Sequence, residues 1–330
     1  MSVKDQSMVK DVPKATADTC FGMEKTKAVE MLIDGLIKSP RAIASLFFYD
    51  DLGSDLFKKI TQLPEYYVTK LEVKLLKQLS PHLIEFLTEC DIVELGSGDC
   101  QKVSTLLDSL NGNLDSTRYI PVDISRKAID DSTESLTVKY PGLALEGIVG
   151  DLFTQINTIS GGRKRLFMVL GSTIGNFSSY KRKSFFKNLR KVMTEKDLFI
   201  LGVDLIKDKS ILESAYNDSQ NITADFNLNI LNVANSVLHS NFDIQNFCHR
   251  AFYNERHSRI EMHIEALREM QISSPCMPFK MHIRKGERIH TENSYKFTLS
   301  QIAGELKSAG FKPKEFHNDS MNWFSLVTSN

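Results

Sequence analysis

The chain has 330 residues, which is enough for about two domains. Its 41 basic and 41 acidic residues cancel, so it lacks the basic excess that is typical of nucleic-acid-binding proteins. With 42% apolar residues the chain can build a sizeable core, and global disorder is therefore excluded.

Targeting signals and cysteine frameworks are also missing from the sequence. No run approaches the roughly 18 apolar residues that a transmembrane helix needs, and the polar N-terminus lacks the apolar segment of a secretory signal. The five cysteines are scattered and form no CxxC pair, which argues against a disulfide framework and a zinc knuckle. We therefore expect a cytoplasmic protein.

The first part of the chain is predicted to be an arm followed by helices. Residues 1–19 are polar and are expected to form a flexible arm. Apolar residues recur at helical spacing over 26–38 and 69–87, and short amphipathic pieces fill 41–66 between them.

A different rhythm begins at residue 91, where short apolar runs alternate with helical stretches. The runs cover 91–96, 118–125, 143–151, 166–173 and 197–205. This alternation predicts a parallel, doubly wound α/β sheet with helices on both faces.

The rhythm changes again near residue 207. Helices predicted at 211–218 and 222–238 precede strand-like runs at 248–255, 259–272 and 279–286, and a helix at 298–309 is followed by a C-terminal antiparallel hairpin. We interpret 20–69 together with 207–295 as an inserted α+β substrate-binding lobe. Residues 70–206 and 296–330 then form a Rossmann-like domain.

A glycine turn marks the end of the first predicted strand of this domain. Glu94-Leu95-Gly96-Ser97-Gly98 allows a sharp turn and a close approach of backbone to ligand, while Asp123 and Asp151 end the next two strands. Position 101 is Gln, so the full GxGxxG fingerprint of dinucleotide sites is absent. The pattern is typical of S-adenosylmethionine (AdoMet) methyltransferases, and another nucleotide or a vestigial site is the alternative.

Five longer strings carry a more specific resemblance. They are LPEYYVTKLE (63–72), VELGSGDCQK (93–102), GSTIGNF (171–177), AYNDSQNITADFNLNIL (215–231) and TENSYKF (291–297). In this order they resemble the histidine-specific Nα-methyltransferases of ergothioneine biosynthesis, which form hercynine from histidine and three AdoMet. The resemblance extends from about residue 38 to the C-terminus, and it implies a class I AdoMet methyltransferase sheet.

The resemblance also implies a set of site residues. The Asn176 and Tyr216 positions would bind the substrate carboxylate, and the Gly171 carbonyl and Tyr49 would address the amine, so that Tyr49, Gly171 and Asn176 take the catalytic roles. The amino-acid site would comprise Tyr66, Asn176, Tyr216, Met262, Glu292 and Ser294, with Glu292 and Ser294 on the imidazole. The cofactor site would comprise Tyr66, Gly96, Lys102, Asp123, Asp151 and Leu152, without a metal.

The chain departs from the family pattern at three positions. Val68 and Lys70 stand where Pro and Arg are more usual, and Leu152 stands where an aromatic residue commonly follows the Asp151 position. Because Leu152 would stack less well on an adenine, this departure affects the expected cofactor affinity more than the chemistry.

Without the resemblance, four of these positions have simpler interpretations. Asn176 could cap the following helix, Tyr216 could be a half-buried helical tyrosine, Glu292 could lie in a solvated turn and Lys102 could lie on the surface. The basic runs at 162–165 and 181–191 are interpreted as a solvated helix face rather than an RNA-binding surface.

Together these observations predict a monomeric, cytoplasmic, AdoMet-dependent enzyme that trimethylates free L-histidine to hercynine. Its partner is then a small-molecule substrate, with no nucleic acid, membrane or metal involved. Two alternatives remain: an N-methyltransferase of another free amino acid such as tryptophan, and a catalytically inactive AdoMet-binding homologue.

Overall fold

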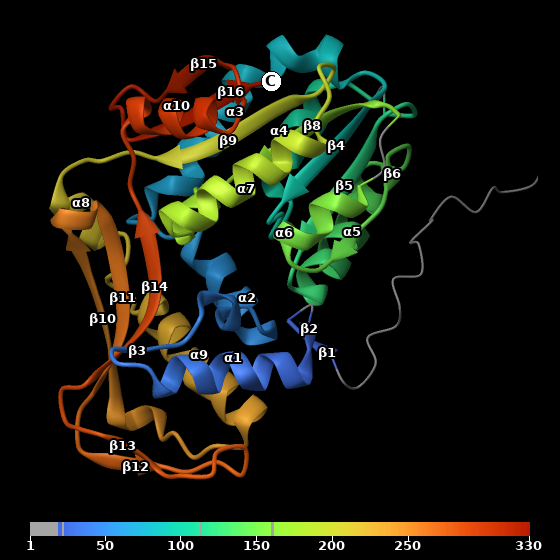
Figure 1. Ribbon diagram of the computed structural model, residues 1–330. Helices are drawn as coiled ribbons and strands as arrows, with labels where there is room; N and C mark the ends of the chain where they lie inside the picture. Colours follow the sequence, from blue (N-terminus) through green and yellow to red (C-terminus); the bar gives the residue numbers. More distant parts are fainter. Residues whose placement is uncertain (1–18, 22, 113, 160–161) are drawn as a thin grey trace, which may run out of the picture. The chain divides into compact units, whose positions relative to one another are not determined.

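The computed structural model describes residues 19–21, 23–112, 114–159 and 162–330, so all but the last residue of the predicted arm lies outside the described part. The chain divides into two compact units (Figure 1). Of the described residues, unit 1 comprises Val68–Leu205 and Phe297–Asn330, and unit 2 comprises 19–67 and Ile206–Lys296.

Unit 1 is built around an eight-stranded sheet with the order β15-β16-β9-β8-β4-β5-β6, in which β7 also pairs with β5. The strands β4 to β9 pair in parallel, whereas β16 runs antiparallel to both β9 and β15. The strands are β4 (Cys90–Leu95), β5 (Arg118–Asp123), β6 (Ala144–Leu145), β7 (Ile148–Val149), β8 (Lys164–Val169), β9 (Leu198–Asp204), β15 (Pro313–Asn318) and β16 (Phe324–Ser329).

Helices connect these strands. They are α3 (Tyr67–Leu87), α4 (Gln101–Ser109), α5 (Arg126–Lys139), α6 (Leu152–Gln155), α7 (Ser179–Val192) and α10 (Leu299–Ser308), with short 3₁₀ turns η2 (Ile156–Thr158) and η3 (Thr173–Asn176). Side-chain oxygens of Ser125, Ser178 and Thr298 accept backbone N–H groups at the starts of α5, α7 and α10. Since β4, β9 and β16 are buried along their whole length, the sheet forms the core of this unit.

Unit 2 contains a second sheet with the order β10-β11-β14-β3, antiparallel except for the parallel pair of β14 and β3. The long helix α9 packs on β10 and β11, and α1, α2 and η1 pack on α9. Its elements are β1 (Thr19–Cys20), β2 (Met23–Glu24), α1 (Lys25–Ile37), β3 (Arg41–Ala42), η1 (Ser45–Phe48), α2 (Asp51–Ile60), α8 (Lys209–Ser214), α9 (Ile222–Leu238), η4 (Ile244–Asn246), β10 (Phe247–Asn254), η5 (Glu255–His257), β11 (Arg259–Ala266), β12 (Met270–Ile272), β13 (Met281–Ile283) and β14 (Arg288–Tyr295).

The predicted α/β fold is confirmed, with two differences in detail. The run at 143–151 forms two short strands separated by Glu146 and Gly147, and a Cβ added at Gly147 would lie 2.6 Å from Ile129 Cγ2. The strand β14 was not predicted at all, because its buried and half-exposed residues do not alternate regularly. Among the described helices, none is both long and apolar enough to cross a membrane.

Candidate active site

The glycine turn of unit 1 lies at the point where the strand order of the sheet reverses. The strands β6-β5-β4-β8-β9 have the order 3-2-1-4-5 of a doubly wound sheet, and ligands of such sheets bind beyond the carboxyl ends of the first and fourth strands. Gly96 and Gly98 follow β4, and Gly171 follows β8, so all three are at this point.

Backbone conformation explains why glycine stands at this turn. Gly96 and Gly98 have φ of +79° and +57°, values that L-residues with side chains rarely adopt. A Cβ added to Gly98 would meet no atom within 4 Å, so the backbone faces open space there. The turn can therefore receive a ligand in close contact with the main chain.

Asp123, at the end of β5, forms a hydrogen bond with the backbone of the turn. Its carboxylate accepts the N–H of Gly98 at 3.0 Å and that of Ser125 at 2.9 Å. Burial raises the pKa of Asp123, and the backbone N–H groups work against that increase. The third predicted acid, Asp151, is exposed and caps α6, in which Leu152 is the first residue.

A charge cluster holds the backbone just after β8, the strand that pairs with β4. Glu72, fully buried on α3, accepts the Gly171 N–H with both oxygens at 2.7 and 2.8 Å and pairs with Lys102 Nζ at 3.0 Å. Burial acts to lower the pKa of Lys102, but the charges of Glu72 and Glu94 outweigh it and raise that pKa. Lys102 thus pairs with the carboxylate that holds Gly171, and it is not a solvated surface residue.

Glu94 completes this cluster. Tyr119 donates to its Oε2 at 2.7 Å, whereas its buried Oε1 has no hydrogen-bond partner among the described residues. Burial raises the pKa of Glu94 to about 7. A buried acceptor without a partner, two residues before the glycine turn, fits a ligand that carries an amino group, as AdoMet does.

Sequence reasoning missed Glu72, although one signal pointed to it. Gly202 lies inside the fully buried strand β9, and a Cβ there would lie 1.9 Å from Glu72 Oε1. Glycine inside a strand often marks the close approach of another group. Here that group is the carboxylate that holds Gly171.

Asn176 lies on η3 and is half-buried. The residue that caps the following helix is Ser178, whose hydroxyl accepts the N–H of Lys181 at 3.3 Å. The simpler interpretation of Asn176 as the cap of α7 is therefore wrong.

In unit 2, three predicted residues lie on neighbouring strands of the four-stranded sheet. Met262 on β11 is opposite Glu292 on β14, and Ser294 follows two residues along β14. All three are buried, so Glu292 does not lie in a solvated turn. Burial raises the pKa of Glu292 to about 7, and the charge of Lys296 opposes this increase.

A β-bulge sets the direction of Glu292. The register of β11 and β14 shifts between Met262 and His263, so that Met262 pairs with Glu292 and His263 pairs with His290. Thr291 is the extra residue, and its hydroxyl donates to Asn227 Oδ1 at 2.7 Å. Because side chains alternate along a strand, the bulge puts Glu292 on the opposite face from His290.

Tyr216 joins the Glu292 face from the turn after α8, outside any helix. Its hydroxyl donates to Ser294 Oγ at 2.8 Å and accepts from Lys296 Nζ at 3.2 Å. The Tyr66 ring lies edge-on to the Tyr216 ring, with centroids 6.4 Å apart. Tyr49 instead packs edge-on against the Phe57 and Phe226 rings.

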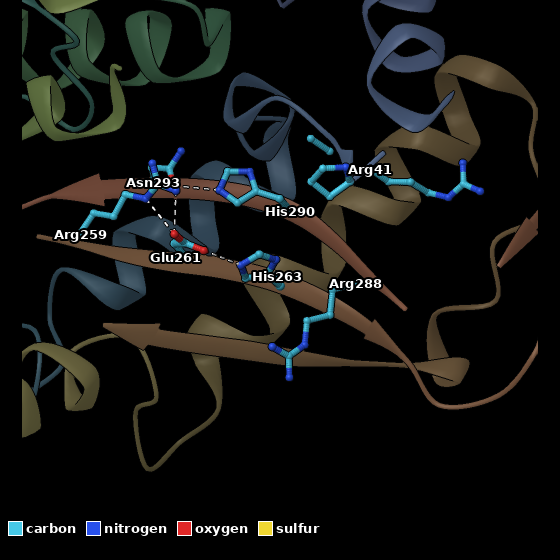
Figure 2. A pocket seen from close by; sticks show the side chains of 9 residues that line it. Arg41, Arg259, Glu261, His263, Arg288, His290 and Asn293 are labelled. Atoms are coloured by element: carbon cyan, nitrogen blue, oxygen red, sulfur yellow. Dashed lines mark hydrogen bonds and ion pairs between the residues drawn. The ribbon is translucent and has the colours of Figure 1, made fainter. Parts of the chain in front are cut away.

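The other face of this sheet carries a separate cavity of about 340 Å³ (Figure 2). Glu261 lies there between Arg259 and His263 and bonds to both, and His290 bonds to Asn293. None of the predicted site residues lines it; the lining residues are Pro40, Arg41, Ala42, Arg259, Glu261, His263, Arg288, His290 and Asn293. The candidate substrate residues thus occupy one face of the sheet and this cavity the other.

The predicted positions fall into two groups, each within one unit. Unit 1 contains Gly96, Lys102, Asp123, Asp151, Leu152, Gly171 and Asn176, and unit 2 contains Tyr49, Tyr66, Tyr216, Met262, Glu292 and Ser294. A doubly wound sheet with a glycine turn after its first strand, an acid after its second and an antiparallel strand inserted next to its fifth defines a class I AdoMet-dependent methyltransferase.

Comparison with known proteins refines this class. The family model described as "Histidine-specific methyltransferase, SAM-dependent" matches residues 28–330, and the chain belongs to this family. The chain is 35% identical over 292 residues to a histidine N-alpha-methyltransferase of Mycobacterium tuberculosis, covering 88% of this chain and 91% of the relative.

Two further matches are more distant. Ergothioneine biosynthesis protein 1 of Neurospora crassa is 28% identical over 281 residues, which cover 83% of this chain but 31% of that protein. A solved S-adenosylmethionine-dependent methyltransferase from Clostridium acetobutylicum matches with a TM-score of 0.44 and 13% identity, covering 78% of this chain and 91% of that chain. The fold assignment rests on the strand order and not on this last match.

Proposed function

We propose that this protein is an AdoMet-dependent Nα-methyltransferase that converts free L-histidine to hercynine by three successive methylations. The observation that carries the proposal is the buried pair of Glu292 and Ser294 on β14, an acceptor and a hydroxyl two residues apart on one face. Family membership and the M. tuberculosis relative support the same substrate.

The selectivity follows from burial. A carboxylate such as Glu292 can accept an imidazole N–H, whereas a purely apolar side chain would leave this buried group unpaired. Sites built to form such hydrogen bonds reject analogues that lack the polar group by about 10⁴-fold. Histidine is therefore favoured over phenylalanine or leucine.

The methyl transfer needs little from acid–base groups of the protein. AdoMet, when bound, supplies a methyl group already activated on a sulfonium. The chain has to bind the amino acid, orient its amine and favour the neutral amine, since an α-amino group is mostly protonated at neutral pH. A buried position disfavours the ammonium form.

The residues that would hold AdoMet are those of the glycine turn. Gly96 and Gly98 allow close approach, Asp123 still has acceptor capacity suited to ribose hydroxyls, and Glu94 Oε1 suits an ammonium group. The roles of Asp151, Leu152 and Tyr66 in this site, and those of Tyr49, Asn176 and Tyr216 toward the amino acid, stay predictions from the family resemblance.

The test is incubation of the purified protein with AdoMet and each of the twenty free amino acids, followed by mass spectrometry. We expect histidine to gain one, two and then three methyl groups, with no comparable gain in the other reactions. The Glu292→Ala variant and a reaction without AdoMet are the controls. Unchanged histidine in the wild-type reaction would overturn the proposal.

A second candidate is N-methylation of another amino acid. A 4-dimethylallyltryptophan N-methyltransferase of Claviceps purpurea is 25% identical over 228 residues, covering 65% of each chain. Methylation of tryptophan but not histidine in the same panel would favour this candidate. Involvement of the product in ergothioneine formation is proposed from the name of the N. crassa relative alone.

A further inference from the structure

Lys296, which no predicted role covers, is a buried cation beside the Glu292–Ser294 pair. It follows directly after β14 and is only 1% exposed. Side chains two residues apart share a face of a strand, so Glu292, Ser294 and Lys296 follow one another on the same side. A buried lysine is costly unless polar groups surround its charge.

The contacts of Lys296 form a triangle. Its Nζ donates to Ser294 Oγ at 2.9 Å and to Tyr216 Oη at 3.2 Å, and the Tyr216 hydroxyl in turn donates to Ser294 Oγ at 2.8 Å. Nζ also lies 5.0 Å from the centroid of the Tyr216 ring, within the range of a cation–π contact.

The donors and acceptors of this triangle determine whether Ser294 can donate or accept toward a ligand. An ammonium group can only donate, so Ser294 Oγ is an acceptor toward Lys296 and, in the observed arrangement, also toward Tyr216. Both lone pairs of the serine oxygen are then used. The serine hydrogen is left to point out of the triangle, where it can only donate.

We propose that Lys296 is a positioning residue that makes Ser294 a hydrogen-bond donor and keeps Glu292 a hydrogen-bond acceptor. The strand β14 then offers one donor and one acceptor to a ligand. Such a pair matches a ring with one N–H and one bare nitrogen, which is a neutral imidazole. This inference rests on the proposed function, because it explains how the histidine side chain is recognised.

Electrostatics supports the assignment of Glu292 as an acceptor. Burial raises the pKa of Glu292, and the positive charge of Lys296 lowers it. Tyr216 is the other titratable group in the triangle. Without Lys296, the carboxyl group would hold its proton to higher pH and would lose its role as a full acceptor near neutrality.

The side chain of Lys296 can be changed without removing its backbone anchor. Its N–H donates to the Ser258 carbonyl at 2.7 Å, a bond that any residue except proline can make. Lys296→Met keeps the length of the side chain and removes the charge. Lys296→Arg keeps the charge and serves as the conservative rescue.

The first measurement is steady-state kinetics on the full chain. We expect Lys296→Met to raise the KM for histidine by roughly 10- to 100-fold, the effect of losing a charge-assisted hydrogen bond, while the KM for AdoMet changes by less than about threefold. Lys296→Arg should recover part of the loss. A matched control is Lys207→Met, since Lys207 Nζ lies 2.8 Å from the Tyr67 hydroxyl and 4.4 Å from the centroid of its ring.

The second measurement does not depend on histidine turnover. The carboxyl carbon of Glu292 is followed by ¹³C NMR in glutamate-labelled protein, and its signal is assigned by its loss in Glu292→Gln. We expect its titration midpoint to move to higher pH in Lys296→Met and not in Lys207→Met.

The outcomes separate the two proposals. A folded Lys296→Met variant with wild-type KM for histidine, or with an unmoved carboxyl titration, overturns the role of Lys296. If the wild-type protein does not methylate histidine, the proposed function fails, and the NMR titration alone then decides whether Lys296 acts on Glu292. Should Lys296→Met fail to fold, the same two measurements are made on Lys296→Gln.

Discussion

The glycine turn of unit 1 and the Glu292 face of unit 2 both gather buried charge, but they are built differently. At the turn, the surface proposed to face AdoMet is main chain, and after β8 the Glu72 carboxylate, paired with Lys102, holds the N–H of Gly171. On the sheet of unit 2, side chains themselves form the surface, and Lys296 supports them from one end of the strand.

This difference has a consequence for substitution. A surface made of main chain depends on the conformations that glycine permits and on the side chains that hold the backbone in place. A surface made of side chains changes its chemistry with each substitution. We therefore expect mutations at the turn to affect stability and AdoMet binding, and mutations on β14 to affect the choice of amino acid.

The largest expected effect is on stability in unit 1. Glu72→Gln leaves the half-buried Lys102 without its carboxylate partner and should lower the free energy of unfolding by about 3 kcal/mol. Urea unfolding measures it, and the double variant Glu72→Gln/Lys102→Met should recover part of the loss. A cost below about 1 kcal/mol would show that the pair is not a structural support.

The next effect concerns histidine and compares the two faces of one sheet. Glu292→Ala should raise the KM for histidine by roughly 100-fold or more and leave the KM for AdoMet within about threefold. The matched control is Glu261→Ala, because Glu261 is also 8% exposed but faces the other side of the sheet. Equal effects of the two variants on histidine would contradict the assignment of the face.

A smaller effect should separate two glycines in unit 1. Gly98 and Gly112 both have positive φ and free space at the Cβ position, so Gly98→Ala and Gly112→Ala should each cost roughly 1–2 kcal/mol of stability. Gly98→Ala alone should also weaken AdoMet binding, by about tenfold or more in calorimetry. Similar affinities for both variants would mean that the ligand does not approach Gly98.

A further expected effect is a pH dependence of stability. Burial raises the pKa of Glu94 and of Glu292 to about 7, above the ordinary value of 4.5. Between these values the folded protein binds more protons than the unfolded chain, so the contribution of each group to stability is greatest below pH 4.5 and declines as the pH rises to 7. Between pH 5 and pH 7.5 the free energy of unfolding should fall more in the wild-type protein than in Glu292→Gln, by an amount on the order of 1–3 kcal/mol. Urea unfolding of both proteins at the two pH values measures this difference.

Much of unit 1 could be predicted from the sequence because its signals are contiguous. The strand β4, the glycine turn and α4 follow one another within about twenty residues, and the hydrophobic pattern of each is regular. Glu72 could not be predicted, since it reaches Gly171 across 99 positions and only Gly202 hints at the contact.

In unit 2 the candidate residues come from the family resemblance, which does not predict their geometry. Tyr216 and Ser294 meet across 78 positions, which no local pattern encodes. The strand that carries Ser294 and Glu292 escaped prediction because the bulge at Thr291 breaks its alternation. Lys296 lies within the string 291–297, and nothing in that string indicates that its charge is buried.

The bulge at Thr291 makes the chemistry of β14 sensitive to chain length. Deleting Thr291 would only remove the bulge and leave Glu292 opposite Met262. Inserting one residue into β11 between Met262 and His263 would instead give Thr291 a partner, restore regular pairing and put Glu292 on the same face as His290. The carboxylate and the hydroxyl that we assign to the imidazole would then share a face with Arg288 and His290, so an insertion in β11 is the length change that exchanges one set of side chains for the other.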